Sequence, residues 1–506
     1  MSRAARLAPV IVAVAALALY LRTLLPGMAF DDWGEMQTVP WVLGVPHPTG
    51  YPTYVMSAWL FERLPLGDVA FRANLFSAVC MALALATATS IGIRLGVRPA
   101  IAAAAAFAAG VVGTIWGSAT VAEVNPLHVL LVTLIVERSL AWAKGRRLRD
   151  LALGGLLVGL SLANHALTVL VAPYAIAFVL WTGRSTLRER PAWLLAPVAT
   201  GIVGLAAYLY IPIAASFDPP LVYNDPVTWD AFRFLVTGEQ FRGQYAGLLS
   251  ATGPATFLGS LPALWDVAAA ELAIPVAVAG AAGAVVLLRR STAAGLLLVA
   301  IAVTGAYAWA NYLRLEHYLL VPFLVSGVLA GVALDAAADA LASVLGERRR
   351  AVAGPALAAI GVVVAVLTVV ANVGAQDRST DRSAEAYVDD VFAVLPQGAA
   401  ILSFWGASPP LWHATLVLGE RPDVLVVDDS NIVYEGWGTR EARIASLVCQ
   451  RPVFIVRPSA FELDPTRHRY AITEVARVPV GYGSPNATTE VPLYRVEPPA
   501  DCPAQG

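Results

Sequence analysis

Charged side chains are scarce in this chain of 506 residues. They make up 14% of it, against about 25% in an ordinary soluble domain, and 58% of the residues are apolar. This composition excludes a water-soluble globule. Lys144 is the only lysine, which we interpret as the coding bias of a GC-rich, bacterial genome. Basic residues number 34 and acidic residues 36, so the chain lacks the basic excess that holds a polyanion, and we expect no nucleic acid partner.

Cysteine and several catalytic motifs are also scarce or missing. The three cysteines include no C-x-x-C pair, so they predict neither a structural zinc nor a redox site. Cys80 lies in an apolar run and is expected in the core, whereas Cys449 and Cys502 could form a disulfide if the tail lies outside the cytoplasm. The chain has no P-loop, no glycine-rich dinucleotide turn and no H-E-x-x-H helix, so arginine would have to hold any phosphate.

Long apolar runs, in contrast, are abundant. A helix needs about 17–25 residues to cross a bilayer, and about eleven stretches are candidates. They centre near residues 8–25, 71–93, 99–116, 123–142, 151–164, 166–182, 192–213, 266–288, 293–311, 316–334 and 352–373. The sequence therefore predicts a mainly α-helical, polytopic membrane protein.

The arginines predict how this protein is oriented. Loops that stay in the cytoplasm carry the positive charge, and arginine clusters occupy every second loop, starting with Arg3 and Arg6. With an odd number of spans, the amino terminus lies inside and the tail after residue 374 lies outside. No small-residue cleavage site follows the first span, so we expect it to be retained. The predicted location is the bacterial cytoplasmic (inner) membrane, with the loops near 26–70, 214–265 and 311–316 on the outer face.

The tail differs in pattern from the rest of the chain. Short β-like runs at 400–404, 424–427 and 452–456 alternate with helical patterns near 383–395 and 438–448. Such alternation is typical of a small α/β domain. We therefore predict two domains, a transmembrane domain over residues 1–374 and an extracytoplasmic α/β domain over residues 375–506.

Two acidic side chains follow the first span directly. Asp32 and Glu35 are three residues apart, so in a helix they project from neighbouring positions on one side. Placing a carboxylate this close to a membrane costs free energy, so such residues usually have a function or a partner. The alternative is a capping box, in which the Asp accepts amide hydrogens at the helix start and the Glu completes the cap. Spacing alone leaves both readings open.

The same loop continues into a rigid turn. Three prolines and two glycines among residues 44–52 fix the backbone around His47 and Tyr51. His47 is therefore either an ordinary loop residue or an imidazole held in place for chemistry.

Four further loops bring polar groups to the same predicted face. Each group alone could be an interfacial anchor or a helix cap, but five loops with ionisable groups on one side favour a shared site. These residues are Glu123 and Asn125, His165, Asn224 and Asp225, and Arg314 and His317.

The first-loop motifs carry a family resemblance. Asp32-Trp33-Gly34-Glu35, followed from His47 by His-Pro-x-Gly-Tyr-Pro, resembles the opening signature of a membrane family of unknown-function domain proteins. Those proteins resemble the protein O-mannosyltransferases, of the GT-C class of glycosyltransferases. The chain departs from the family pattern at Trp33 and Thr49, neither of which is ionisable. Weaker similarity continues in order through most of the chain.

The resemblance implies a fold and an activity. The fold would be of the GT-C type, with about eleven transmembrane helices and a C-terminal extracytoplasmic α/β domain. The enzyme would move a sugar, with mannose the first candidate, from a polyprenyl-phosphate donor to a hydroxyl group on the outer face, by inverting displacement. The acceptor would be a glycan or a serine or threonine of an exported protein. We expect no cofactor and no obligatory metal, although carboxylates such as those of Asp32, Glu35 and Glu123 also suit Mg²⁺ or Mn²⁺.

The resemblance also implies roles for individual residues. Asp32 would be the general base, and Glu35 would orient Asp32 or the acceptor. His47 and Arg314, and less directly His165, would hold the phosphate. Substrate binding is expected to involve His47, Tyr51, Glu123, Asn125, His165, Asn224, Asp225, Arg314 and His317.

Two other classes of protein fit parts of the pattern. A transporter or flippase of lipid-linked glycans would be expected to have broken helices at mid-membrane and related halves, and the sequence shows neither. Its ionisable groups would also lie near span centres, whereas the predicted site has them at one face. A non-catalytic envelope assembly protein would use its tail for binding, and replacing Asp32 would then have no effect.

Overall fold

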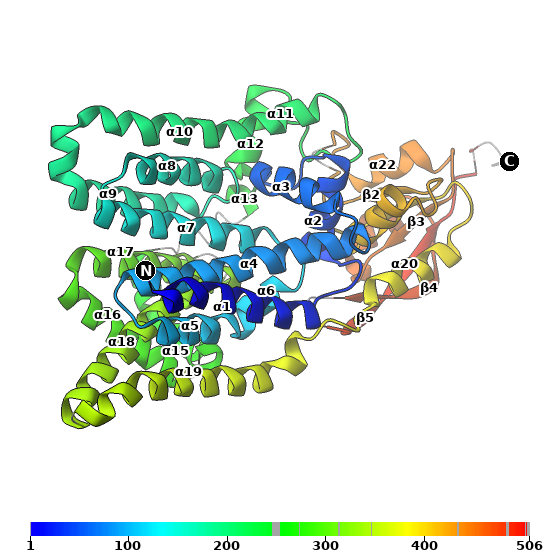
Figure 1. Cartoon of the computed structure of the whole chain (residues 1–506). Helices are drawn as coiled ribbons and strands as arrows, with labels where there is room; N and C mark the ends of the chain where they lie inside the picture. The colour runs from blue at the N-terminus through cyan, green and yellow to red at the C-terminus, as the bar shows by residue number, and fades with distance from the viewer. Residues whose placement is uncertain are drawn as a thin grey trace.

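The computed structural model describes residues 2–244, 253–272, 274–311, 314–345, 347–432, 435–481, 485–500 and 502. Long helices lie side by side at one end of the molecule, and a small sheet with its own helices lies at the other (Figure 1). The predicted mainly helical fold with a C-terminal α/β domain is therefore confirmed.

The helical part begins with α1 (Arg3–Arg22), α2 (Asp31–Val42), α3 (Pro52–Glu62), α4 (Val69–Arg94), α5 (Pro99–Gly110), α6 (Gly113–Ala119), α7 (Val124–Gly145), α8 (Leu148–Leu162) and α9 (Thr168–Glu189). It continues with η1 (Pro191–Leu194), α10 (Leu195–Leu205), η2 (Ala206–Leu209), α11 (Tyr210–Ala215), α12 (Trp229–Val236), α13 (Glu239–Gln244), α15 (Pro254–Leu272), α16 (Ile274–Arg290), α17 (Thr292–Asn311), η3 (Glu316–Leu319), α18 (Leu320–Leu345) and α19 (Glu347–Gln376).

The helices mark this chain as a multi-pass membrane protein. Within the described residues, eight helical segments are long and apolar enough to cross a bilayer, or nine if α5 and α6, bent by 77°, form one span. The predicted count of about eleven is not confirmed. The stretch at 151–164 corresponds to α8, which has only 15 residues, and the stretch at 266–288 falls on α15 and α16, with residue 273 between them outside the described residues.

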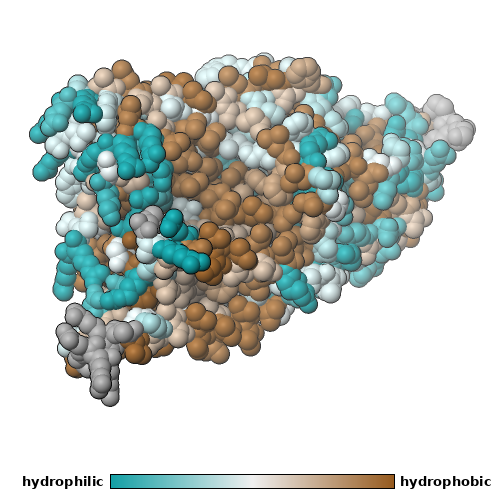
Figure 2. Space-filling model, viewed as in Figure 1, coloured by the Kyte–Doolittle hydropathy of each residue, from teal (hydrophilic) through white to brown (hydrophobic). Residues whose placement is uncertain are grey.

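The surface agrees with a lipid environment. Figure 2 shows hydrophobic residues over the middle of the helical part and hydrophilic residues at both ends of the molecule. Large apolar side chains there point outward, such as Leu195 on α10, which is 70% exposed, and Leu367 on α19, which is 63% exposed. Contact with lipid removes the cost of leaving such side chains in water.

Glycine allows α8 and α10 to pack closely against each other. A Cβ atom on Gly159 of α8 would overlap the carbonyl oxygen of Gly201 on α10, and one on Gly204 would lie 2.6 Å from the carbonyl oxygen of Leu156. Only the absence of a side chain lets these two backbones approach, which is how small residues commonly act between membrane helices.

The C-terminal domain contains α20 (Ser383–Val394), β1 (Ala400–Ser403), α21 (Ser408–Trp412), the π-helical η4 (His413–Leu418), β2 (Leu425–Asp428), α22 (Arg440–Leu447), β3 (Val453–Val456), η5 (Ala460–Leu463), α23 (Asp464–Arg467), β4 (Ile472–Gly481) and β5 (Thr488–Val496). The strand order is β2-β1-β3-β5-β4. The three predicted runs form the parallel strands β1, β2 and β3, whereas the antiparallel β4 and β5 were not predicted. Cys449 and Cys502 form a disulfide, and Cys80 is buried.

The segment that follows α1 packs against both the membrane helices and the C-terminal domain. Met28 and Phe30 are buried in the same apolar cluster as α20 and the sheet. At Gly34 of α2, a Cβ atom would lie 2.7 Å from the Cβ of Pro409 on α21, so the two helices touch through this glycine. This packing places the start of α2 between the membrane helices and the carboxyl end of β1.

Candidate active site

The start of α2 is not capped by its own acidic side chains. The N-cap residue is Phe30, which offers no side-chain hydrogen bond. The free amide of Asp31 donates instead to the carbonyl oxygen of Gly406 in the C-terminal domain, at 3.2 Å. The capping-box reading of Asp32 and Glu35 is therefore wrong, and both carboxylates have other partners.

Glu35 pairs with His47. Its side chain is buried, Oε1 accepts a hydrogen bond from the backbone N–H of His47 at 2.9 Å, and Oε2 contacts Nδ1 of the same residue. On the other edge of the imidazole, Nε2 lies 3.2 Å from the Tyr51 hydroxyl and 3.8 Å from Oδ2 of Asp32. The rigid turn and the first two turns of α2 thus bring together Asp32, Glu35, His47 and Tyr51.

The neighbouring carboxylates keep His47 charged. Burial by itself lowers the pKa of an imidazole, but here Glu35 and then Asp32 outweigh it and raise the pKa of His47 to about 9. Burial also raises the pKa of Glu35, with His47 opposing this shift. At neutral pH the site therefore presents an imidazolium beside Asp32, whose side chain is 54% exposed.

Glu123 and Asn125 lie next to this group. Glu123 caps α7, since its Oε1 accepts from the backbone N–H of Val124 at 2.9 Å, and Asn125 Nδ2 donates to the same oxygen at 3.0 Å. Burial, followed by the charge of Asp32, raises the pKa of Glu123 to about 7. Among the described residues, no donor reaches the buried Oδ1 of Asn125, which leaves an acceptor free for a ligand.

Three histidines continue the polar region towards the helices. The rings of His165 and His128 lie 5.0 Å apart, and His165 also lies 6.0 Å from Tyr51. His128, His317 and Asn125 contribute polar groups to the lining of a cavity whose other walls are mostly apolar side chains of α7, α9, α17 and α18. Burial lowers the pKa of His165 well below its ordinary value, so this ring is neutral.

A second cavity extends the first into the helix bundle. Its empty volume is about 340 Å³, and Val129, Ile301 and Val321 line both cavities. Its lining is apolar throughout except for Thr133. Asn125, which hydrogen-bonds Glu123, lines the first cavity, whereas Asp32, Glu35 and His47 line neither of the two.

Three predicted residues stand apart from the group. Asn224 and Asp225 form a left-handed turn, with φ of 62° and 38°, before α12. Arg314 lies 3.5 Å from the Ser260 hydroxyl and over the ring of Trp309. Among the described residues, no hydrogen bond or ion pair joins any of these three to Asp32, Glu35 or His47, so their predicted binding roles stay predictions.

The structure also adds two residues, Trp405 and His128, that were not among the predicted site residues. Nε1 of Trp405 donates to Oδ1 of Asp32 at 2.6 Å, and its ring meets the His47 ring edge-on at 5.6 Å. As an aromatic residue of the tail, Trp405 could be expected either to stack on a sugar or to pack in the core, but the sequence does not indicate its contact with Asp32, 373 residues away. His128 did carry a signal, because it follows Asn125 by three residues and so lies on the same face of α7.

The acidic group also has the composition of a metal site. Asp32, Glu35 and His47 each offer one ligand atom, and these atoms lie within 4.8 Å of one another. A cation would have to compete for His47, since Glu35 contacts Nδ1 and Tyr51 lies beside Nε2. The absence of an obligatory metal stays a prediction.

The sequence of this region is similar to known proteins. Residues 32–188 match the family described as Protein O-mannosyl-transferase TMEM260 N-terminal domain, a segment that contains Asp32, Glu35 and His47. The mouse (Mus musculus) Protein O-mannosyl-transferase TMEM260 is 28% identical over 206 residues. That alignment covers 39% of this chain and 29% of the mouse protein. The predicted family resemblance is thereby confirmed.

The whole fold is similar to solved membrane proteins. Apo ArnT from Cupriavidus metallidurans has a TM-score of 0.58 at 12% identity, covering 96% of this chain and 97% of ArnT. The same protein bound to undecaprenyl phosphate has a TM-score of 0.54 at 14% identity, with the same coverage. The archaeal oligosaccharyltransferase AglB from Archaeoglobus fulgidus, in complex with an inhibitory peptide and a dolichol-phosphate, has a TM-score of 0.51 at 12% identity, covering 88% of this chain and 69% of AglB. The chain therefore has the GT-C fold of ArnT, and its residues 32–188 are similar to the N-terminal domain of the TMEM260 protein O-mannosyl-transferases.

Proposed function

We propose that this chain is a membrane glycosyltransferase that moves a sugar, with mannose the first candidate, from a polyprenyl-phosphate donor to a hydroxyl acceptor. The observation that carries the proposal is the pairing of an exposed carboxylate, Asp32, with a partly buried imidazolium, His47, near a largely apolar cavity between membrane helices that Asn125 and His128 line. The mouse relative is named a protein O-mannosyl-transferase, and ArnT and AglB were solved with polyprenyl or dolichol phosphates.

The donor would lie along the two cavities. Their apolar walls suit an isoprenoid chain, and the polar groups of Asn125, His128 and His317 suit the phosphate and the sugar. The free Oδ1 of Asn125 would accept a hydrogen bond from a sugar hydroxyl. Because the donor is carried by a lipid, the enzyme that uses it would have to lie in the membrane.

The reaction would be a single displacement. Asp32 takes the proton of the acceptor hydroxyl as its oxygen bonds to the anomeric carbon, and the bond from that carbon to the phosphate oxygen breaks. The charge that develops on the departing polyprenyl phosphate is stabilised by His47, with His165 and Arg314 as further candidates. Because both Glu35 oxygens are engaged with His47, Glu35 would charge and orient that imidazole rather than Asp32.

The proposed orientation follows from the arginine pattern. The amino terminus would lie in the cytoplasm, and the C-terminal domain and the active site would lie on the outer face of a bacterial inner membrane. The acceptor would then be a glycan or a serine or threonine of an exported protein.

The test is sugar transfer by the purified protein in detergent. Polyprenyl-phosphate mannose, glucose and arabinose, each radiolabelled, would be offered with peptide and glycan acceptors. Asp32→Asn should lower the rate by about 100- to 10,000-fold, the usual effect of losing a general base, because it removes the base with little change in shape. Asp390→Asn, at an exposed position on α20, is the matched control and should keep the wild-type rate.

Two outcomes would contradict the proposal. One is the absence of transfer from all three donors, and the other is full activity of Asp32→Asn. A glycan transporter or an assembly protein would give the first result, since neither needs to form a new glycosidic bond.

A further inference from the structure

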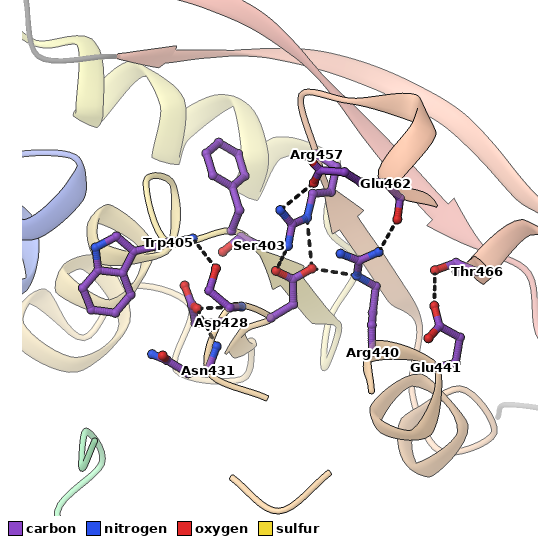
Figure 3. Close-up of polar contacts among 12 residues, drawn as sticks. Ser403, Trp405, Asp428, Asn431, Arg440, Glu441, Arg457, Glu462 and Thr466 are labelled. Carbon is purple, nitrogen blue, oxygen red and sulfur yellow. Dashed lines mark hydrogen bonds and ion pairs between the residues drawn. The ribbon is translucent and has the colours of Figure 1, made fainter. Parts of the chain in front are cut away.

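Trp405 is a residue of the C-terminal domain that reaches the active site. It lies just past the carboxyl end of β1, where ligand-binding groups of parallel sheets commonly gather. Figure 3 shows its indole pointing away from the network of Arg440, Arg457 and Glu462 on the far side of the same edge. The indole therefore does not belong to the ion-pair network of its own domain.

The indole of Trp405 contacts residues of the active site and its surroundings. Its N–H donates to Oδ1 of Asp32 at 2.6 Å, and its ring meets His47 at 5.6 Å and Tyr223 at 6.3 Å, each edge-on. Trp412 packs behind it at 6.0 Å. A single side chain from the second domain thus contacts both the proposed base and the proposed phosphate-binding imidazolium.

A buried carboxylate holds the backbone of Trp405 in place. The Trp405 N–H donates to Oγ of Ser430 at 3.2 Å, and the Ser430 N–H donates to Oδ1 of Asp428 at 2.9 Å. The other oxygen of Asp428 accepts from Oγ of Ser408 at the start of α21. Asp428 therefore ties together the two segments that flank Trp405, and the indole projects from a fixed base.

The start of α2, which carries Asp32, depends on contacts from the C-terminal domain. Because Phe30 provides no side-chain cap, the first amide of α2 is satisfied by the carbonyl of Gly406, the residue after Trp405. The Asp32 side chain is half exposed, and Trp405 donates the one side-chain hydrogen bond that this carboxylate accepts among the described residues. Without it, the carboxylate could rotate among rotamers in solvent.

We infer that Trp405 is a positioning residue, which holds Asp32 in the rotamer that meets the acceptor hydroxyl. This inference rests on the proposed function. A hydrogen bond to a charged group is strong enough that its loss changes a rate by about 10- to 100-fold. The loss should appear in kcat, because removing the indole N–H affects the proposed base, Asp32, while an aromatic ring at this position keeps its contact with His47, the proposed phosphate-binding group.

The experiment uses Trp405→Phe in the full-length protein. Phenylalanine keeps an aromatic ring against His47 but lacks the N–H. The matched control is Trp437→Phe, whose indole packs over Arg443 in the same domain. We expect Trp405→Phe to lower kcat by about 10- to 100-fold with KM for the donor changed less than about two-fold, and Trp437→Phe to match the wild type. In an Asp32→Asn background, Trp405→Phe should have no further effect, because the two residues act together.

Two results would overturn the positioning role. One is a kcat for Trp405→Phe equal to that of Trp437→Phe. The other is that Trp405→Phe lowers kcat by the same factor in the Asp32→Asn variant as it does in the wild type.

A second measurement does not depend on activity. All 13 tryptophans would be labelled with ¹⁵N and their indole N–H signals recorded by NMR. The signal that disappears in Trp405→Phe belongs to Trp405. It should shift in Asp32→Asn and keep its position in Asp390→Asn. An unshifted signal would overturn the contact itself. Absence of transfer by the wild type, with a shifted signal, would instead overturn the proposed function and leave the contact established.

Discussion

The pairing of Glu35 with His47 makes a prediction that depends on pH. Glu35→Gln keeps an acceptor for the His47 backbone N–H but removes the negative charge beside Nδ1. Burial is the largest influence on His47, and without Glu35 it is opposed mainly by Asp32. We therefore expect the pKa of His47 to fall from about 9 towards its ordinary value of 6.5.

The size of the effect follows from the protonated fraction. The imidazolium, which is the proposed active form, is present below the pKa and lost above it. At pH 8, a pKa of about 9 leaves about nine-tenths of His47 charged, whereas a pKa of 6.5 leaves about one thirtieth. Glu35→Gln should therefore lower the transfer rate by about 30-fold at pH 8 but by less than about two-fold at pH 6.

The assay is the rate of sugar transfer over a pH series at saturating donor. The wild type should lose activity above pH about 9, and the variant should lose it from about 6.5. Glu490→Gln, at an exposed position on β5, is the control for loss of a carboxylate and should follow the wild type. An equal loss at pH 6 and pH 8 would show that Glu35 does not act through the charge of His47.

Two further predictions concern the metal and the disulfide. Dialysis against EDTA should leave the transfer rate unchanged, because the ring nitrogens of His47 already have partners in Glu35 and Tyr51; a loss that Mn²⁺ or Mg²⁺ restores would contradict this. Replacing Cys449 and Cys502 together by alanine should lower the free energy of unfolding of the C-terminal domain by about 4 kcal/mol, the chain entropy that a crosslink across 53 residues removes. The free energy of unfolding is measured by denaturing the wild type with and without a reductant. If the reductant does not shift the unfolding transition of the wild type, the estimate is refuted.

The helices were predictable because a bilayer imposes a length and a composition on each span. The stretch predicted at 293–311 is α17, Thr292–Asn311, and the one at 71–93 is α4, Val69–Arg94. Strands β1 to β3 were predictable for a similar reason, since buried strands read as short apolar runs. The long pair β4 and β5 was missed because only three of the ten residues of β4 are buried and it contains Pro479, which is unusual within a strand.

The candidate site was predictable only in part. Asp32, Glu35 and His47 stood out because charge and a rigid turn beside a span are costly and visible in the sequence. Their contacts were not visible, and the capping reading of the acidic pair fitted the same spacing. Glu35 meets a residue 12 positions away, which the turn of prolines and glycines alone does not specify.

The sequence by itself determined that the chain lies in a membrane, that a small α/β domain ends it, and that acidic and imidazole groups follow the first span. These properties depend on local composition and spacing. The tertiary structure decided which groups meet, including the contact between Asp32 and Trp405 across 373 residues. The physical reason is range, since a hydrogen bond forms only at about 3 Å, and only the packing of two distant domains brings such atoms together.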